Sequence, residues 1–307
     1  MTERRSYKAL VSDNARWDAV TLRPGDIIVS TPPKCGTTWM QTSVGLVLFQ
    51  TPDLPAPLSE LSPWVDMLTW PLDELTATIE AQQHRRFLKS HTPLDGLPWD
   101  EHVTYICVGR DPRDVALSWD NHIASMDMGN FLTARIAAVG ADDLDPSMIP
   151  ETPADPVDRF WAWIETDRPG NEIDGLANLV NHIETFWSKR DEPNVHLFHY
   201  AEMEADLPGQ LRRLAAILGV DVPDDRWDAL VQAATFESMK AKADVLAPDT
   251  THKIWQDNAM FFQRGGGSGS WRVIMGDDEL PRYRARVDAL ASPELVEWLH
   301  QGSLAPA

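Results

Sequence analysis

Cysteine is scarce in this sequence, which has only Cys35 and Cys107 among its 307 residues. Two cysteines offer no disulfide framework, and such sparse use suits a reducing compartment. Long apolar runs are also missing. Residues 1–17 have no apolar core of the kind that a signal peptide needs, and no stretch approaches the length of a membrane span. We therefore expect a cytoplasmic protein with no stable membrane insertion.

Basic residues are few, since 27 Lys and Arg stand against 47 Asp and Glu, giving a formal net charge of −20. A nucleic-acid-binding surface needs basic patches to meet the phosphate backbone, so we expect no nucleic-acid partner. An anionic ligand must instead be held by positive groups concentrated at one place, against the unfavourable field of the whole chain. The zinc-binding signature HExxH is absent as well, and metal binding is not expected.

The glycine-rich ATP loop, Gly, four residues and then Gly-Lys-Ser/Thr, is also absent. Residues 30–39 (STPPKCGTTW) instead place a lysine before a glycine, between the apolar run 27–29 and a helix-like run that starts at Thr38. Gly36 lets the backbone approach a ligand, and the N–H groups at the start of a helix point toward it. Lys34 adds a charge, and the threonines add hydroxyl donors. This P-loop-like turn predicts a site for a phosphate-like anion, but not ATP bound in the usual way.

Four short apolar runs alternate with segments long enough for helices. The runs predict strands over 26–31, 86–90, 103–109 and 195–199. Helices are predicted over 37–50, 72–83, 112–126, 174–190, 206–219, 225–240 and 279–300. This alternation is typical of a parallel sheet with helices on both faces. We predict one α/β domain over residues 1–307, in which the aperiodic, Asp-, Pro- and Met-rich residues 126–158 form a long loop or a mobile lid.

Polar residues follow two of the predicted strands. Arg110 comes directly after the strand that ends at Gly109, at the edge where open α/β sheets bind ligands. Asp111 and Pro112 suit the cap and the first residue of a helix, and Ser118 lies almost two turns into it. Taken alone, this pattern is equally consistent with an ordinary strand–helix junction whose charges face water.

His91 follows another strand end, within the segment Phe87 to Pro93 that also includes Lys89. A histidine there can act as a general base, because its unperturbed pKa of about 6.5 suits proton abstraction near neutral pH. The alternative is a structural hydrogen-bonding role, which is the commoner one for a histidine chosen at random.

Taken together, these motifs resemble the PAPS-dependent sulfotransferases, specifically the soluble type that sulfates small hydroxyl or amine compounds. The resemblance begins at LRPGDIIVSTPPKCGTTW, which is similar to the family's 5′-phosphosulfate loop. It continues in the same order, over roughly residues 20 to 275, through KSHTPLDGLP, GRDPRDVALS, FHYAEMEADLPGQLRRLAAILGV, ATFESMK and, in part, RGGGSGSW. Several motifs in the family's order are far more specific than any one of them.

The resemblance implies a donor, 3′-phosphoadenosine 5′-phosphosulfate (PAPS), and no metal. It places the 5′-phosphosulfate on Lys34, Gly36, Thr37 and Thr38. It places the 3′-phosphate on Arg110, Ser118, Arg264, Gly265 and Gly266. It places the adenine against Trp39, Tyr200, Thr235, Phe236 and Met239. It makes His91 the general base, with Lys34 and Lys89 as the cations at the transferring group.

Several positions depart from the family pattern. Pro32 and Cys35 replace a tyrosine and a serine of the loop, Gly265 stands where lysine is common, and Ser270 replaces an aspartate. The family's dimer motif is not recognisable, so the oligomeric state stays open. The acceptor is expected to be a small, apolar compound with a hydroxyl or amine. Four tryptophans could line its pocket or belong to the core: Trp64, Trp70, Trp161 and Trp163.

Two alternatives remain beside sulfonate transfer. A kinase built on a related loop would depend on ATP and Mg²⁺, and would need an acidic metal ligand near Lys34 that the sequence does not display at a recognised offset. A non-catalytic nucleotide-binding protein would need no base, so His91 and Lys34 count against it.

Overall fold

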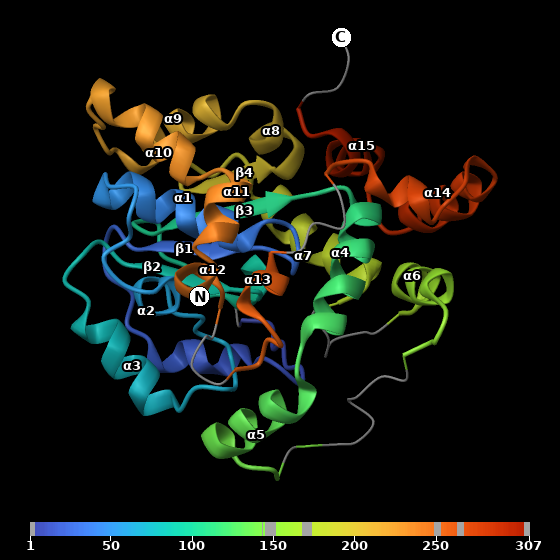
Figure 1. The fold of residues 1–307 in the computed structure, drawn as a ribbon, viewed down its shortest axis with the longest axis horizontal. Coiled ribbons are helices and arrows are strands. Elements are labelled where there is room, and N and C mark those ends of the chain that lie inside the picture. The colour runs from blue at the N-terminus through green and yellow to red at the C-terminus, as the bar shows by residue number, and fades with distance from the viewer. Residues whose placement is uncertain are drawn as a thin grey trace.

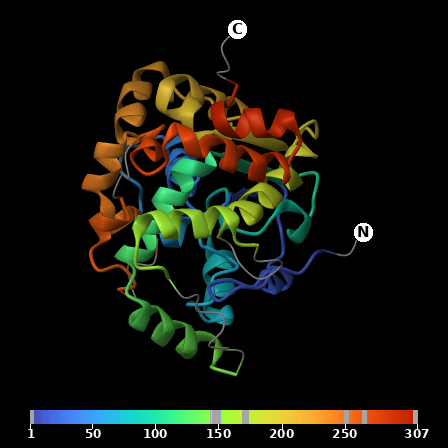
Figure 2. The same ribbon diagram turned by 90° about the vertical axis from the view of Figure 1, so that its right-hand side faces the viewer.

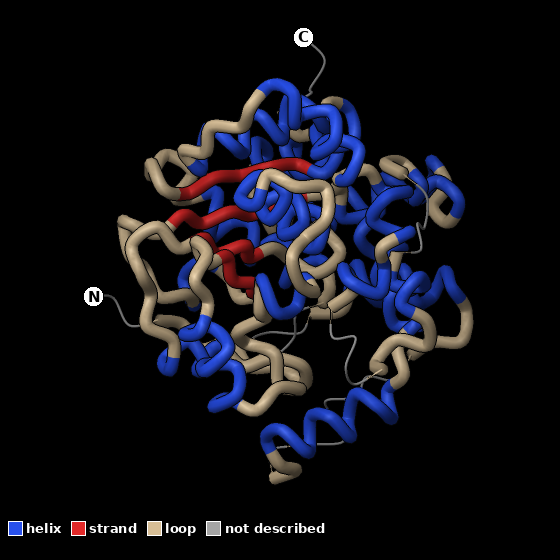
Figure 3. The backbone as a smooth tube through the Cα atoms, turned by 60° about the vertical axis from the view of Figure 1, so that its left-hand side comes forward, coloured by secondary structure: helices blue, strands red, loops and turns tan. Residues whose placement is uncertain are grey.

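A four-stranded parallel sheet forms the centre of the molecule. The computed structural model describes residues 4–142, 144, 152–167, 174–248, 253–262 and 267–303. The strands are β1 (Ile27–Ser30), β2 (Phe87–Ser90), β3 (Thr104–Gly109) and β4 (Val195–His199), in the spatial order β2-β1-β3-β4. Figure 3 shows them side by side, with helices on both sides. The four predicted strands and the parallel sheet are confirmed, each strand within one residue or so at either end.

The strands β1, β2 and β3 are buried at nearly every position, as expected for strands covered on both faces, whereas His196 and Leu197 of the edge strand β4 are only half-buried. Successive side chains of a strand point to opposite faces, and along β1 Ile28 enters one core while Ile27 and Val29 enter the other. The first core packs against α4 (Pro112–Ser125), α6 (Pro156–Glu165), α7 (Leu176–Trp187), α14 (Leu280–Asp288) and α15 (Pro293–Gln301). The second packs against α1 (Thr37–Phe49), α9 (Leu207–Leu218), α10 (Trp227–Ala233) and α11 (Phe236–Ala241). Figure 1 shows α9 and α10 beside α1, and α14 and α15 on the other side of the sheet.

The remaining helices lie around this centre. They are α2 (Leu58–Leu61), α3 (Leu72–Ala81), α5 (Met128–Val139), α8 (Tyr200–Ala205), α12 (Ala243–Leu246) and α13 (Asn258–Phe261). Five predicted helices agree with the structure to within three residues at either end: α1, α3, α4, α7 and α9.

Two predicted helices are wrong as continuous elements. The segment 225–240 breaks into α10 and α11, because the side chain of Thr235 accepts the N–H of Ser238 and so starts a new helix. The segment 279–300 breaks into α14 and α15, where Ser292 caps the N–H of Leu295 and Pro293 takes the first turn. In each case the apolar spacing of the sequence continues from the first helix into the second. The spacing alone therefore predicted one helix where the structure has two.

The prediction of an irregular loop over residues 126–158 is wrong for its first half. Residues Met128–Val139 form α5, whose N–H groups are capped by Asp127, and α6 begins at Pro156. Phe131 and Arg135 are the large side chains by which α5 is buried against the rest of the protein. Figure 1 and Figure 2 place α5 at the end of the molecule away from α9 and α10. Residues 143 and 145–151 lie outside the described part, and the lid stays a prediction.

Candidate active site

Polar residues follow the carboxyl ends of all four strands. The loop with Lys34 follows β1, His91 follows β2, Arg110 follows β3, and Tyr200 follows β4. Because the strands are parallel, these four positions meet at one edge of the sheet, where open α/β proteins bind their ligands. The fold therefore brings residues from distant parts of the chain to one site.

The loop between β1 and α1 turns tightly before the helix starts. Lys34 has a φ of 68° and Gly36 a φ of 105°, both in the left-handed region. A Cβ added to Gly36 would lie 3.2 Å from Cδ2 of Tyr200, so only glycine fits without displacing that ring. Gly36 is the N-cap of α1 and contributes no side-chain cap, which leaves the first N–H groups of the helix for a ligand. Beside them, the hydroxyl oxygens of Thr31 and Thr37 lie 2.5 Å apart, and Thr38 is buried.

Arg110 joins this loop to β4. Its Nη1 donates to the carbonyl oxygen of Lys34 at 2.9 Å, and its guanidinium lies 4.1 Å from the centre of the Tyr200 ring. Its Nε is buried and has no hydrogen-bond partner among the described residues. A buried donor without a partner is costly, so this atom fits an anion that the chain itself does not provide. Ser118, also predicted for this anion, is half-buried on α4.

A second group of predicted residues is linked through Trp39. Its indole Nε1 donates to the carbonyl oxygen of Ala234 at 2.9 Å, and its ring meets that of Tyr200 edge to face at 5.2 Å. The residue after Ala234 is Thr235, which caps α11, and Phe236 and Met239 of α11 pack in the same apolar core. The structure therefore brings the residues predicted for the adenine to one side of the loop. Arg264, Gly265 and Gly266 lie outside the described residues.

His91 is buried and its ring is fixed. Nδ1 lies 2.6 Å from the carbonyl oxygen of Thr31, and the Trp64 ring meets the imidazole at 4.7 Å, edge to face. Because a carbonyl oxygen only accepts, Nδ1 carries the hydrogen and the lone pair is on Nε2. Burial lowers the pKa of His91 well below 6.5, and the charge of Lys89 lowers it further. The imidazole is therefore neutral near pH 7, with Nε2 as the proton acceptor.

Two lysines approach the same centre. Nζ of Lys89, a buried residue of β2, lies 3.9 Å from the centre of the Trp64 ring. Nζ of Lys34 lies 4.7 Å from the centre of the Phe261 ring. Burial and, to a smaller extent, the positive charge of Arg110 together lower the pKa of Lys34 to about 7. These cations are poorly solvated, and an anion would meet them with little water between.

His122 is a residue of this centre that the sequence reasoning missed. Its Nδ1 lies 3.4 Å from Nζ of Lys34, and its ring contacts Trp119, Trp255 and Phe261. Burial lowers its pKa well below 6.5, and the charges of Lys34 and Lys89 lower it further. The available signal was its position four residues after Ser118, on the same face of α4.

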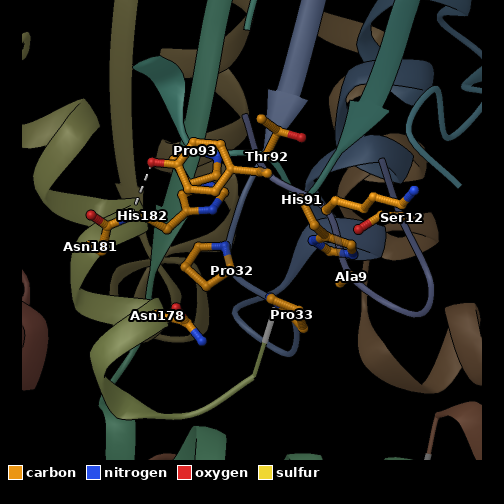
Figure 4. Close-up of a pocket in the computed structure, with 12 residues that line it drawn as sticks. Ala9, Ser12, Pro32, Pro33, His91, Thr92, Pro93, Asn178, Asn181 and His182 are labelled. Atoms are coloured by element: carbon orange, nitrogen blue, oxygen red, sulfur yellow. Dashed lines mark hydrogen bonds between the residues drawn. The ribbon is translucent and has the colours of Figure 1, made fainter. Parts of the chain in front are cut away.

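A small pocket opens beside His91, with a cavity volume of about 30 Å³. Figure 4 shows Asn178, Asn181 and His182 of α7 on one side, with Pro32 and Pro33 between them and His91. None of the four tryptophans proposed for an acceptor pocket lines it. Trp161 and Trp163 are buried in the first core, whereas Trp64 lies against His91 and Lys89.

Comparisons with known proteins identify the family. The family model described as a sulfotransferase domain matches residues 24–297. The chain belongs to this family. It is 45% identical over 314 residues to a glycolipid sulfotransferase of Mycobacterium bovis, covering 98% of this chain and 96% of that protein. It is 25% identical to Sulfotransferase 1B1 of Canis lupus familiaris, over 81% of this chain and 78% of that protein.

The fold of the sulfotransferase family is also found in solved structures. A retinol dehydratase crystallised with retinol and PAP matches with a TM-score of 0.67 at 21% identity, over 92% of this chain and 87% of that chain. A mouse sulfotransferase complexed with PAP matches with the same TM-score at 18% identity, over 93% and 92%. The predictions of a sulfotransferase fold and of an enzyme that transfers a sulfonate group to a small acceptor are confirmed, and neither alternative is favoured.

Two departures from the family pattern have structural explanations. The Cys35 thiol is buried in the first core, where burial raises its pKa to about 12, so it stays a neutral thiol within the protein. Near Ser270, the glycine-rich segment is held by α4, because the carboxylate of Asp114 accepts the N–H groups of Gly269 and Trp271 at 2.8 and 3.1 Å. The residues just after those predicted for the 3′-phosphate are therefore anchored to α4. A flexible linker would not be held in this way.

Two kinds of feature are absent from the described residues. Within the described ranges, no group of three or more His, Cys, Asp or Glu side chains is placed to hold a metal ion. Among the helices of those ranges, none is both long enough and apolar enough to span a membrane.

Proposed function

We propose that this sulfotransferase uses PAPS as its donor and transfers the sulfonate to a hydroxyl of a small acceptor, with His91 as the general base. The orientation of His91 supports the proposal most directly. Its Nδ1–H is held by Thr31, its pKa is lowered, and the residue lines an open pocket. A histidine in this state accepts a proton on Nε2 without first losing one.

The residues at the sheet edge fit a donor with two anionic ends. The uncapped start of α1 and Lys34 suit the 5′-phosphosulfate, with Gly36, Thr37 and Thr38 around it. The unpartnered Nε of Arg110 suits a 3′-phosphate, with Ser118 and the undescribed Arg264, Gly265 and Gly266 as further predicted contacts. The adenine ring of the donor would contact the residues predicted to bind it: Trp39, Tyr200, Thr235, Phe236 and Met239.

When bound, the donor supplies an activated sulfonate. The chain supplies position, charge and a proton acceptor. Nε2 of His91 accepts the proton of the acceptor hydroxyl as that oxygen attacks the sulfur. The bond between the sulfur and the bridging oxygen of the 5′-phosphate breaks, and 3′,5′-ADP leaves with the electron pair. Lys34 and Lys89 place positive charge beside the transferring group, and the aromatic rings of Trp64 and Phe261 exclude water from both cations.

The relatives support a class of acceptor for this protein, but not a particular compound. The mycobacterial proteins at 44–45% identity are named glycolipid sulfotransferases, which supports a hydroxyl on an acceptor with an apolar portion. A cytoplasmic location also stays a proposal, which cell fractionation would test.

A thermal-shift panel combined with a transfer assay tests the proposal. A ligand that binds only the folded state at ~100 times its Kd raises stability by about 2.7 kcal/mol. We expect 3′,5′-ADP to raise Tm clearly more than 5′-AMP, and ATP with Mg²⁺ to raise it least. We also expect radiolabelled sulfonate to move from PAPS to an alcohol. Preference for ATP with Mg²⁺, together with no transfer from PAPS, would refute the proposal.

A further inference from the structure

Residues 63–66 run beside β2, which is an outer strand of the sheet. The N–H of Lys89 donates to the carbonyl oxygen of Pro63 at 2.9 Å, and the N–H of Val65 donates to the carbonyl oxygen of Lys89 at 3.0 Å. The pairing is parallel, with Trp64 opposite Lys89. These residues therefore act as a short additional strand that holds the main chain of Lys89.

His91 lies two residues further along, just beyond the end of β2. Main-chain N–H groups of alternate residues in a strand face the same neighbour, so the N–H of His91 faces the side on which Lys89 is held. Residues 65 and 66 form a turn at this point. The acceptor for the N–H of His91 is instead the side chain of Asp66, whose Oδ2 lies 3.3 Å from it. The carboxylate thus takes the place of the carbonyl that a longer partner strand would provide.

Asp66 is itself held firmly. It is 1% exposed, its Oδ2 also accepts the hydroxyl of Thr92 at 3.1 Å, and its carbonyl oxygen accepts the N–H of Asp13 at 2.9 Å. Its Oδ1 is buried and has no hydrogen-bond partner among the described residues. A buried carboxyl with one unpaired oxygen is a poor choice for stability alone. What distinguishes this side chain is therefore its hold on residues 91 and 92.

The general base is consequently fixed at two points. Its imidazole is held through Nδ1 by the carbonyl of Thr31 at 2.6 Å, and its main chain is held by Asp66. Anchors at both ends of the side chain restrict where Nε2 can lie. Such restriction matters for proton transfer, because a reacting group misplaced by ~1 Å can lose on the order of 10²-fold in rate.

We propose that Asp66 is the positioning residue of the general base, and that it fixes the main chain of His91 so that Nε2 faces the acceptor hydroxyl. The acceptor oxygen of Asp66, and not its charge, provides this hold. Asp66 touches neither the donor nor the acceptor and acts only through His91. The proposal rests on the sulfotransferase function above, in which His91 is the base, and adds the residue that orients it.

Two substitutions separate the acceptor oxygen from the charge. Asp66→Ala removes the acceptor, so kcat should fall on the order of tenfold to 100-fold, while KM for PAPS and Kd for 3′,5′-ADP stay close to wild type. Asp66→Asn keeps an acceptor oxygen and should keep kcat within about threefold, although its buried amide N–H groups should lower Tm. Counting kcat per 3′,5′-ADP-binding site removes the contribution of unfolded protein. An equal loss of kcat in both variants would mean that the charge matters, and the proposal would be wrong.

A matched control removes another buried carboxylate. Asp26, just before β1, is 2% exposed and accepts Nε of Arg86 at 2.9 Å. Asp26→Ala should lower Tm and leave kcat per site unchanged. The base itself gives a second control: in a His91→Ala background, Asp66→Ala should cost no further activity, because Asp66 acts through the imidazole. A further loss in that background would contradict the proposal.

Hydrogen exchange measures the contact without any transfer. The amide of His91, followed by NMR, should exchange faster in Asp66→Ala than in wild type or Asp66→Asn. If it does so but wild type transfers no sulfonate from PAPS, the hold on His91 stands and the proposed function fails. If wild type transfers sulfonate and Asp66→Ala keeps full kcat per site, the positioning role is wrong and the function stands.

Discussion

Nζ of Lys34 lies 3.4 Å from Nδ1 of His122, which joins the loop after β1 to the last turn of α4. The lysine is the residue expected to meet the sulfonate end of the donor, and its pKa is lowered to about 7. A charged amine can only donate, so Nδ1 of His122 is the acceptor and its hydrogen lies on Nε2. The charged form of Lys34 is thereby favoured over what burial alone would allow.

Replacing His122 should change how donor binding depends on pH. In wild type, affinity for 3′,5′-ADP should fall as the pH rises through about 7, because Lys34 loses its charge there. His122→Phe keeps a ring against Trp255 and removes the acceptor, so the pKa of Lys34 falls and the midpoint moves to lower pH. Calorimetric titrations of 3′,5′-ADP from pH 5.5 to 8.5 measure this midpoint. His102→Phe, at an exposed histidine, is the control. An unchanged midpoint would show that the contact has no effect on Lys34.

Removing the imidazole of His91 should abolish transfer and spare donor binding. General-base catalysis contributes about 10²–10⁴-fold, so His91→Ala should lose at least ~100-fold in kcat. Affinity for 3′,5′-ADP should stay close to the wild-type value, because the ring bonds to Thr31 and not to the loop amides. Steady-state kinetics and calorimetry on the same preparation measure both. Full activity in this variant would refute the assignment of the base.

Arg110 should distinguish nucleotides by their 3′ end. A hydrogen bond to a charged group is worth ~1.5–3 kcal/mol, so Arg110→Ala should weaken 3′,5′-ADP on the order of tenfold or more. Binding of 5′-AMP, which has no 3′-phosphate, should weaken much less. Arg212→Ala, an arginine exposed on α9, serves as the control for lost charge. Equal losses for both nucleotides would mean that Arg110 acts only by holding the carbonyl of Lys34.

Acid should destabilise the fold through its buried histidines, and His182 gives the clearest case. Burial lowers its pKa in the folded protein to about 3, whereas an unfolded chain protonates histidine near pH ~6.5. Below pH ~6.5 the unfolded state binds more protons, so the stabilisation present above that pH is lost as the pH falls toward 3. Each such group costs up to about 1.4 kcal/mol per pH unit. Urea unfolding between pH 7 and 4 should show a shallower loss for His182→Gln; a parallel slope would contradict this.

Gly36 should tolerate alanine less well than another left-handed glycine. Gly219, at the end of α9, has a φ of 63° and open space around its Cα, so Gly219→Ala suffers backbone strain alone, ~1–2 kcal/mol. Gly36→Ala adds a contact of 3.2 Å with Tyr200, in the same region where the donor is expected. We expect the larger loss of unfolding free energy, and weaker 3′,5′-ADP binding, in Gly36→Ala. Equal losses in the two variants would contradict this prediction and would mean that the Tyr200 ring moves aside for the added methyl group at little cost.

The sequence was sufficient for the sheet and for the residues at its edge. The strands β1 and β3 are buried at nearly every position and are mostly apolar, so their ends were easy to locate. Lys34, His91 and Arg110 directly follow such ends, or nearly so, and the fold brings them together because the strands are parallel.

Other features depend on contacts that a linear pattern does not contain. The α5 helix is held by Phe131 and by Arg135, whose Nε donates to the carbonyl of Leu10, 125 positions away. The contribution of His122 depends on where α4 crosses the loop of Lys34. The pocket beside His91 depends on Tyr7, which reaches α7 from the start of the chain. Tertiary proximity, and not local propensity, determines all three.

The placement of Tyr7 has a consequence for how such enzymes diversify. The family model matches from residue 24 onward, whereas four of the residues that line the pocket lie before it: Tyr7, Lys8, Ala9 and Ser12. Substitutions in these four residues would reshape the pocket beside His91 without changing any residue that the family model covers. Part of the pocket wall is thus separable along the chain from the residues expected to bind the donor. A bulky group attached near Tyr7 would lie close to the opening beside His91.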